Sequence, residues 1–218
     1  IAEVLVRDPR DLAYVKQSSL GKSLHAWRVI PSAEENIKEN PYLRELSLGM
    51  REETLVKALE LPEKDFLALA QLMFELHQNE LVPSLVRLLE NVASPSAINL
   101  LKFYSQKTGA PLIRNYCNLA LYRQKEEGPY YENLKKWIND QHNIDLIRFR
   151  PFIPMQMRDE KSKYQLTPEE TSRLLVESFE SLIEAQDERG IDILLHAIRY
   201  GNSNNKYALA GLLIHATL

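Results

Sequence analysis

Few side chains in this sequence have the types and spacing that catalysis or metal binding requires. Gly21, Lys22 and Ser23 have the order that ends a phosphate-binding loop, G-x-x-x-x-G-K-[ST]. Lys16 stands where the first glycine of that loop belongs and no strand pattern precedes it, so we expect no nucleotide site. Zinc sites need ligands at defined spacings, and the histidines are too scattered for us to expect a metal site. They are His25, His77, His142, His196 and His215.

Cys117 is the single cysteine, so the chain can form neither an internal disulfide nor a cysteine-based zinc cage. It lies in an apolar helical pattern with Ile113 and Leu121, whereas a reactive cysteine needs a cationic, partly exposed setting. We therefore interpret Cys117 as a core residue, with a nucleophile or a chromophore attachment site as the alternative. Paired glutamates such as Glu169-Glu170 fall at helix ends or on polar faces, where they favour the helix dipole or are solvated. We predict no catalytic residue, no enzyme activity and no cofactor.

One irregular segment, residues 143–166, combines side chains that are typical of binding hot spots. Pro151 and Pro154 prevent a long helix there, because the residue before a proline is pushed into an extended conformation. Arginine and aromatic residues are enriched at hot spots, and insertions in repeat proteins are often used for binding. The alternative is a plug that packs on the helices and fills gaps with its apolar side chains. The candidate partner-binding residues are Arg148, Phe149, Arg150, Phe152, Met155 and Arg158.

The elements around this segment are all expected to be helices. The chain has 7 glycines in 218 residues, about half the usual ~7% share, and tight turns between strands consume glycine. Apolar residues make up 44% and charged residues 26% of the chain, as in globular domains with a sizeable core. No run approaches ~18 consecutive apolar residues, so we expect no membrane span.

Apolar residues that recur every three or four positions predict the individual helices. Ser94 should cap one helix, and Thr167-Pro168-Glu169-Glu170 has the order of a capping box. Pro62 and Gly128-Pro129 should end the helices that precede them. The predicted helices run over residues 54–61, 64–77, 81–92, 95–109, from 111 past 121, 131–138, 167 to about 187, 189–200 and from 203 to the end of the chain.

Two helix pairs match each other at one constant offset of 109 positions, as 198 minus 89 shows. In the first helix of each pair, Leu85 aligns with Leu194 and Val86 with Leu195. The turn and the second helix follow without a gap, with Leu100 opposite Leu209. A helix pair of roughly 25–40 residues is the unit of several helical repeat families.

Three stretches resemble HEAT-type repeats, including the short variety named for phycobilisome lyases: "ELVPSLVRLLENVASPSAINLLKFYSQKTG", "APLIRNYCNLALYRQ" and "GIDILLHAIRYGNSNNKYALAGLLIHATL". The likeness covers residues 60–140 and 187–218 well and the first sixty residues loosely. The Asp-Pro corner usual in that family is mostly absent here. The resemblance implies an all-α fold, an α-α superhelix in which antiparallel helix pairs stack into a solenoid. It brings no shared catalytic residues.

We therefore expect a single HEAT-like solenoid domain over residues 1–218, with the irregular insertion at 143–166. The chain starts at Ile1 without an initiator methionine and ends inside an apolar helical pattern, which we interpret as a fragment of a longer protein. An exposed apolar helix around Ala208–Ile214 would lack its covering repeat. One cysteine and no targeting segment suit the cytoplasm, with export of a processed chain as the alternative.

The function that this fold favours is a protein–protein interaction scaffold. It would bind a protein or peptide partner through its concave surface and the irregular segment. The alternatives are a lyase-like enzyme, by analogy with the chromophore-attaching relatives, and a nucleic-acid binder. The net charge of -3 disfavours nucleic acid, because phosphate binding depends on a basic surplus. A basic stripe would have to come from Lys57, Lys64, Arg87, Lys102, Lys107, Arg114 and Arg123.

Overall fold

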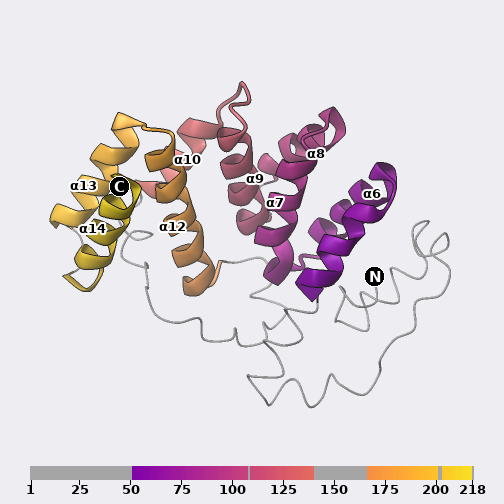
Figure 1. Cartoon of the computed structure of the whole chain (residues 1–218), viewed down its shortest axis with the longest axis horizontal. Helices are drawn as coiled ribbons and strands as arrows, with labels where there is room; N and C mark the ends of the chain where they lie inside the picture. The colour runs from indigo at the N-terminus through magenta and orange to yellow at the C-terminus, as the bar shows by residue number, and fades with distance from the viewer. Residues whose placement is uncertain (1–50, 108, 140–165, 201–202, 218) are drawn as a thin grey trace, which may run out of the picture. The chain divides into compact units, whose positions relative to one another are not determined.

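The computed structural model describes residues 51–107, 109–139, 166–200 and 203–217, and every regular element in those ranges is a helix (Figure 1). This confirms the all-α prediction. Contacts divide the chain into two compact units, with residues 51–104 in the first and the described residues from 105 onward in the second. The single solenoid over residues 1–218 stays a prediction, and residues 1–50 lie outside the described residues. Within those ranges, no helix is both long enough and apolar enough to cross a bilayer.

The first unit is built from short helices joined by corners of a few residues. Its helical stretch at residues 51–57 continues into a 3-10 turn, so the predicted helix over 54–61 changes its winding before Pro62 ends it. The predicted helices over 64–77, 81–92 and 95–109 are confirmed, with ends that shift by a few residues. The further elements are η1 (Ala58–Glu60), α6 (Glu63–Glu75), η2 (Asn79–Leu81), α7 (Val82–Val92) and α8 (Pro95–Ser105).

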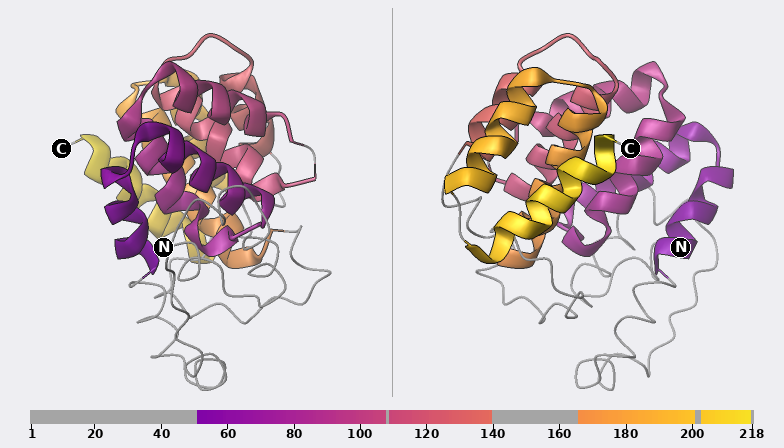
Figure 2. Two further views of the ribbon diagram at one scale, coloured as in Figure 1. Left: turned by 90° about the vertical axis from the view of Figure 1, so that its right-hand side faces the viewer. Right: turned by 60° about the vertical axis from the view of Figure 1, so that its left-hand side comes forward.

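The second unit is centred on one long helix, α12 (Pro168–Glu184), which contacts every other helix named here. α9 (Pro111–Arg123) and α10 (Tyr130–Ile138) pack against each other and against α12. α13 (Glu188–Tyr200) and α14 (Ser203–Thr217) form an adjacent pair that also packs on α12 (Figure 2). All five helices occur where the sequence predicts them, although α12 ends at Glu184 rather than near Asp187.

In the described ranges four helices end in left-handed residues that are not glycine, and one of these residues is Ala93, at the end of α7, with a φ angle of 48°. His77, Lys125 and Gln186 have φ angles of 50°, 57° and 53°. Around each of them the chain forms the paired hydrogen bonds of a Schellman motif, as when Gln78 N–H donates to Met73 O at 3.0 Å. This use of non-glycine residues explains how so many corners form in a chain with only 7 glycines.

The predicted helix starts are present. Ser94 Oγ accepts from Ala97 N–H at 3.1 Å and caps α8. In the capping box of α12, Glu170 N–H donates to Thr167 Oγ1 at 3.2 Å and Thr167 N–H donates to Glu170 Oε2 at 3.0 Å. Short polar motifs therefore fix where these helices begin.

Gly190 of α13 packs closely against Leu182 of α12. A Cβ built at Gly190 would lie 2.7 Å from Leu182 Cβ, a separation that side chains do not tolerate without movement. We expect Gly190→Ala to lower the free energy of unfolding by about 1–3 kcal/mol, because it overpacks a buried contact. Gly211 in α14 is the matched control, since nothing lies within 4 Å of its built Cβ. Gly211→Ala should raise stability by about 0.5–1 kcal/mol through helix propensity. Urea unfolding followed by circular dichroism measures both, and a neutral Gly190→Ala would contradict this packing.

Candidate functional site

The irregular segment predicted to bind a partner lies outside the described residues, apart from its last residue, Leu166. Its six candidate residues, from Arg148 to Arg158, therefore stay a prediction. The choice between a partner contact and a packed plug stays open with them.

The other chemistry-bearing residues can be placed where the structure describes them. Cys117 is fully buried on α9, which confirms its interpretation as a core residue. His196 is exposed on α13, with its ring centroid 4.7 Å from that of Tyr200. In the described ranges, no group of three or more His, Cys, Asp or Glu side chains is placed to hold a metal ion.

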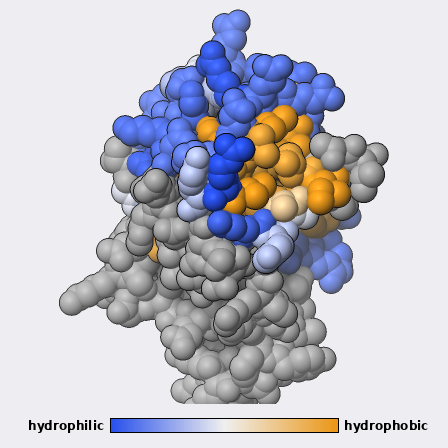
Figure 3. Space-filling view, turned by 90° about the vertical axis from the view of Figure 1, so that its left-hand side faces the viewer, coloured by the Kyte–Doolittle hydropathy of each residue, from blue (hydrophilic) through white to orange (hydrophobic). Residues whose placement is uncertain are grey.

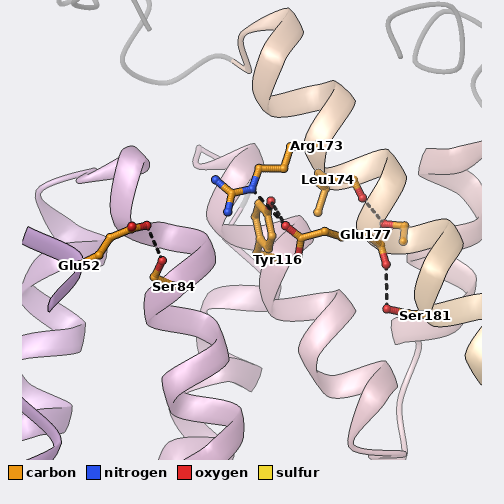
Figure 4. Close-up of polar contacts among 8 residues, drawn as sticks. Glu52, Ser84, Tyr116, Arg173, Leu174, Glu177 and Ser181 are labelled. Carbon is orange, nitrogen blue, oxygen red and sulfur yellow. Dashed lines mark hydrogen bonds and ion pairs between the residues drawn. The ribbon is translucent and has the colours of Figure 1, made fainter. Parts of the chain in front are cut away.

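A buried polar cluster joins α9 to α12 (Figure 4). The Tyr116 hydroxyl donates to Glu177 Oε1 at 3.2 Å, and Arg173 Nε donates to the same oxygen at 3.2 Å. Burial, reinforced by the negative charge of Glu177, raises the pKa of Tyr116 far above its usual value. Tyr116 therefore stays protonated and donates a hydrogen bond. A tyrosine that acted as a base or nucleophile would need the opposite shift, so we interpret the cluster as a clamp between two helices.

Neighbouring polar groups on α12 are satisfied within their own helix. The Ser178 and Ser181 hydroxyls donate to the carbonyl oxygens of Leu174 at 2.6 Å and Glu177 at 2.8 Å. Such bonds satisfy hydroxyls that the packing has removed from water. The polar cluster on α12 thus has a structural explanation that needs no ligand.

A second tyrosine cluster ties α10 to the start of α13. Tyr131 Oη donates to Asp187 Oδ1 at 3.2 Å, and the same carboxylate oxygen caps α13 by accepting from Gly190 N–H at 3.0 Å. The ring of Tyr122 lies 5.7 Å from that of Tyr131 between centroids. Burial, together with the charge of Asp187, raises the pKa of Tyr122 to about 12. These contacts again hold helices together.

In the first unit, polar contacts fix the turn between α6 and α7. The buried Arg51 guanidinium donates to Glu80 Oε2 at 2.8 Å and to Gln78 Oε1 at 2.9 Å. Ser84 Oγ on α7 donates to Glu52 Oε1 at 2.8 Å (Figure 4). Both contacts join residues about thirty positions apart in the sequence. Glu52 is therefore a packing residue here and not merely a solvated charge.

The outer side of α13 and α14 is the strongest candidate for a functional surface. Leu195 is 45% exposed, Ile214 60% and Tyr207 88%. Viewed from the side where these two helices lie, apolar side chains gather into one patch bordered by polar ones (Figure 3). Exposed apolar patches rimmed by polar residues are typical of interaction sites. We define the α13–α14 surface by exposed and half-buried side chains of these two helices, namely Ile191, Leu195, Ile198, Tyr207, Ala210 and Ile214.

The composition of α14 explains why this surface forms. Its buried residue Leu209 is followed by the half-buried Ala210, Leu212 and Leu213 and by the exposed Ile214. A helix that is apolar on all sides is normally buried on all sides. The second unit buries only one side of α14 and leaves the opposite apolar side in contact with water.

Comparison of this chain with protein-family models, with curated proteins and with solved structures found no match. The resemblance to HEAT-type repeats therefore stays a prediction from the sequence.

Proposed function

We propose that this chain is a protein-binding scaffold of HEAT-like helical repeats and that the α13–α14 surface contacts its partner. The observation that carries the proposal is the exposed apolar side of α14, with Tyr207 and Ile214 facing water. Burying such side chains against another protein gains about 25 cal/mol for each Å² of apolar surface removed from water. Tyrosine is also one of the residue types enriched at protein interfaces.

The internal repeat supports this assignment. At the offset of 109 positions, Leu195 of α13 corresponds to Val86 of α7. Val86 is fully buried in its own unit, whereas Leu195 is 45% exposed. Leu85 and Leu194, the preceding pair, are both fully buried. A position that is packed in one helix pair is therefore uncovered in the other, as expected where a further protein element docks.

The irregular segment is proposed as a second contact. Arg148, Phe149, Arg150, Phe152, Met155 and Arg158 have the composition of a binding hot spot. Stacked helix pairs of the HEAT type also form a concave surface that accommodates a peptide or protein. The scaffold would then bind through its helices and through this segment.

Affinity capture from lysate on the immobilised chain tests the proposal. We expect Leu195→Glu combined with Ile214→Glu to lose a protein that the original chain retains, because two charges would enter an apolar contact. Val56→Glu is the matched control, since Val56 is also exposed on a helix but belongs to the first unit. It should retain the same protein.

A separate variant tests the irregular segment. Arg148, Phe149, Arg150 and Phe152 are changed to Ala together, and circular dichroism confirms that each variant keeps its helix content. Loss of the partner with this variant would support a direct contact, and unchanged retention would favour the packed plug. If the Leu195→Glu/Ile214→Glu variant captures as much protein as Val56→Glu does, the proposed role of the α13–α14 surface is wrong.

A further inference from the structure

One flank of α13 carries an apolar line that is symmetric about its centre. The inner side of the helix is formed by the buried Gly190, Leu194 and Ala197. Beside it, the half-buried Ile191, the exposed Leu195 and the half-buried Ile198 follow at intervals of four and three residues. Side chains at these intervals lie on one line along a helix. The line therefore runs through Leu195, with one isoleucine on each side.

Two exposed side chains of opposite charge border this line. Asp192 follows Ile191 and Arg199 follows Ile198, so they take equivalent places at the two ends of the line. They are seven residues apart, or about 10.5 Å along the axis at 1.5 Å per residue. Ion pairs within a helix form at three or four residues, so these two charges are too far apart to pair within one chain.

This arrangement is complementary to itself when the helix direction is reversed. An antiparallel copy of α13 related by a two-fold axis near Leu195 would place Leu195 against its own equivalent. The same axis would bring Ile191 opposite the copy's Ile198 and Asp192 opposite the copy's Arg199. The midpoints of these pairs fall at positions 195, 194.5 and 195.5, so one axis near Leu195 satisfies all three to within half a residue, or about 0.75 Å along the helix.

We propose that a second copy of this chain docks on α13 and that the chain forms a two-fold symmetric dimer. The inference rests on the proposed function, because it names the partner of the α13–α14 surface. Symmetric dimer interfaces require that each residue find its complement on the same patch of the other copy. The order Asp192, Leu195, Arg199 along α13 meets that requirement. Binding of an unrelated protein would not require the surface to be symmetric in this way.

The dimer holds together through an apolar line and two ion pairs. A line of three aliphatic residues on each chain makes a small interface, so we expect a dissociation constant between about 1 µM and 1 mM. The two symmetric Asp192–Arg199 pairs fix the antiparallel register. Reversing one charge creates two like-charge contacts at once, and such contacts weaken an interface strongly.

Sedimentation of the full chain at increasing concentration tests the proposal. The original chain should pass from monomer to dimer, and Asp192→Arg and Arg199→Asp should each raise the dissociation constant at least tenfold. Mixing the two single variants in equal amounts should restore a dimer, because each then supplies the charge that the other lacks. That recovery also shows that both variants are folded, and it cannot arise from a contact within one chain.

Three results would overturn the dimer. The first is that the original chain stays monomeric up to about 1 mM. The second is that the two single variants dimerise as strongly as the original chain does. The third is that the equal mixture of the two variants remains monomeric. The capture experiment with Leu195→Glu/Ile214→Glu separates this failure from failure of the proposed function. A monomeric chain whose α13–α14 surface still captures a different protein would refute self-association and leave the binding function standing.

Discussion

Replacing Phe179 by Ala should lower the free energy of unfolding by about 3–5 kcal/mol. Phe179 is fully buried on α12, the helix that contacts α9, α10, α13 and α14. Removing its ring leaves a cavity at the centre of the second unit, and the surrounding helices can fill it only in part. Urea unfolding monitored by far-UV circular dichroism gives the change directly.

Phe103→Ala is the matched control, because it removes the same ring from an exposed position. Phe103 is 58% exposed on α8 and meets Tyr104 edge-on with ring centroids 5.1 Å apart. We expect this change to cost less than about 1 kcal/mol, as most surface substitutions do. Similar costs for the two variants would contradict the position of Phe179 in the core.

The second large effect is a loss of stability in alkaline solution that depends on Tyr116. Its pKa in the folded chain lies above the usual value of 10.0 because burial, and then the charge of Glu177, disfavour the phenolate. Above pH ~10 the unfolded chain releases this proton while the folded chain keeps it. The stabilisation is therefore fully present below pH ~10 and falls by about 1.4 kcal/mol for each further pH unit.

Tyr116→Phe isolates this effect. At neutral pH the variant should be about 1–2 kcal/mol less stable, because Glu177 loses a buried hydrogen bond. Its stability should then fall less steeply than that of the original chain between pH ~10 and pH ~11. Unfolding midpoints in urea across this range provide the comparison. If the two curves stay parallel, Tyr116 is not the buried donor described here.

Local features of the fold could be predicted because their causes lie within a few residues. The capping box at Thr167 and Glu170 and the cap at Ser94 depend on hydrogen bonds that span three positions. The helix stop at Pro62 follows from the missing N–H of proline. The left-handed corners at His77 and Gln186 could not be foreseen, because no glycine marks them.

The polar clusters could not be predicted because each joins residues distant in the sequence. Tyr116 and Glu177 are 61 positions apart, and Arg51 and Glu80 are 29 apart. Nothing in the local pattern around Glu177 distinguishes a buried carboxylate from the solvated ones expected on a helix surface. Such pairs become visible only when tertiary packing brings the helices together.

Exposure of the candidate surface was predictable only in part. The apolar composition of α14 indicated an exposed apolar helix, and Ile214 is indeed exposed. The repeat alignment alone treated Val86 and Leu195 as equivalent, although one is buried and the other is half uncovered. The difference depends on which elements pack beside each helix, and a periodic pattern cannot specify its neighbours.

Photo-crosslinking in cells that produce the chain tests most directly whether the α13–α14 surface is an interface. A photoreactive phenylalanine derivative replaces Leu195 in one variant. In the control it replaces Val56, which is 53% exposed. If the α13–α14 surface is an interface, irradiation joins position 195 to a second protein chain, either another copy or a different protein, and position 56 stays at background. Equal labelling at both positions, or none at position 195, would contradict it.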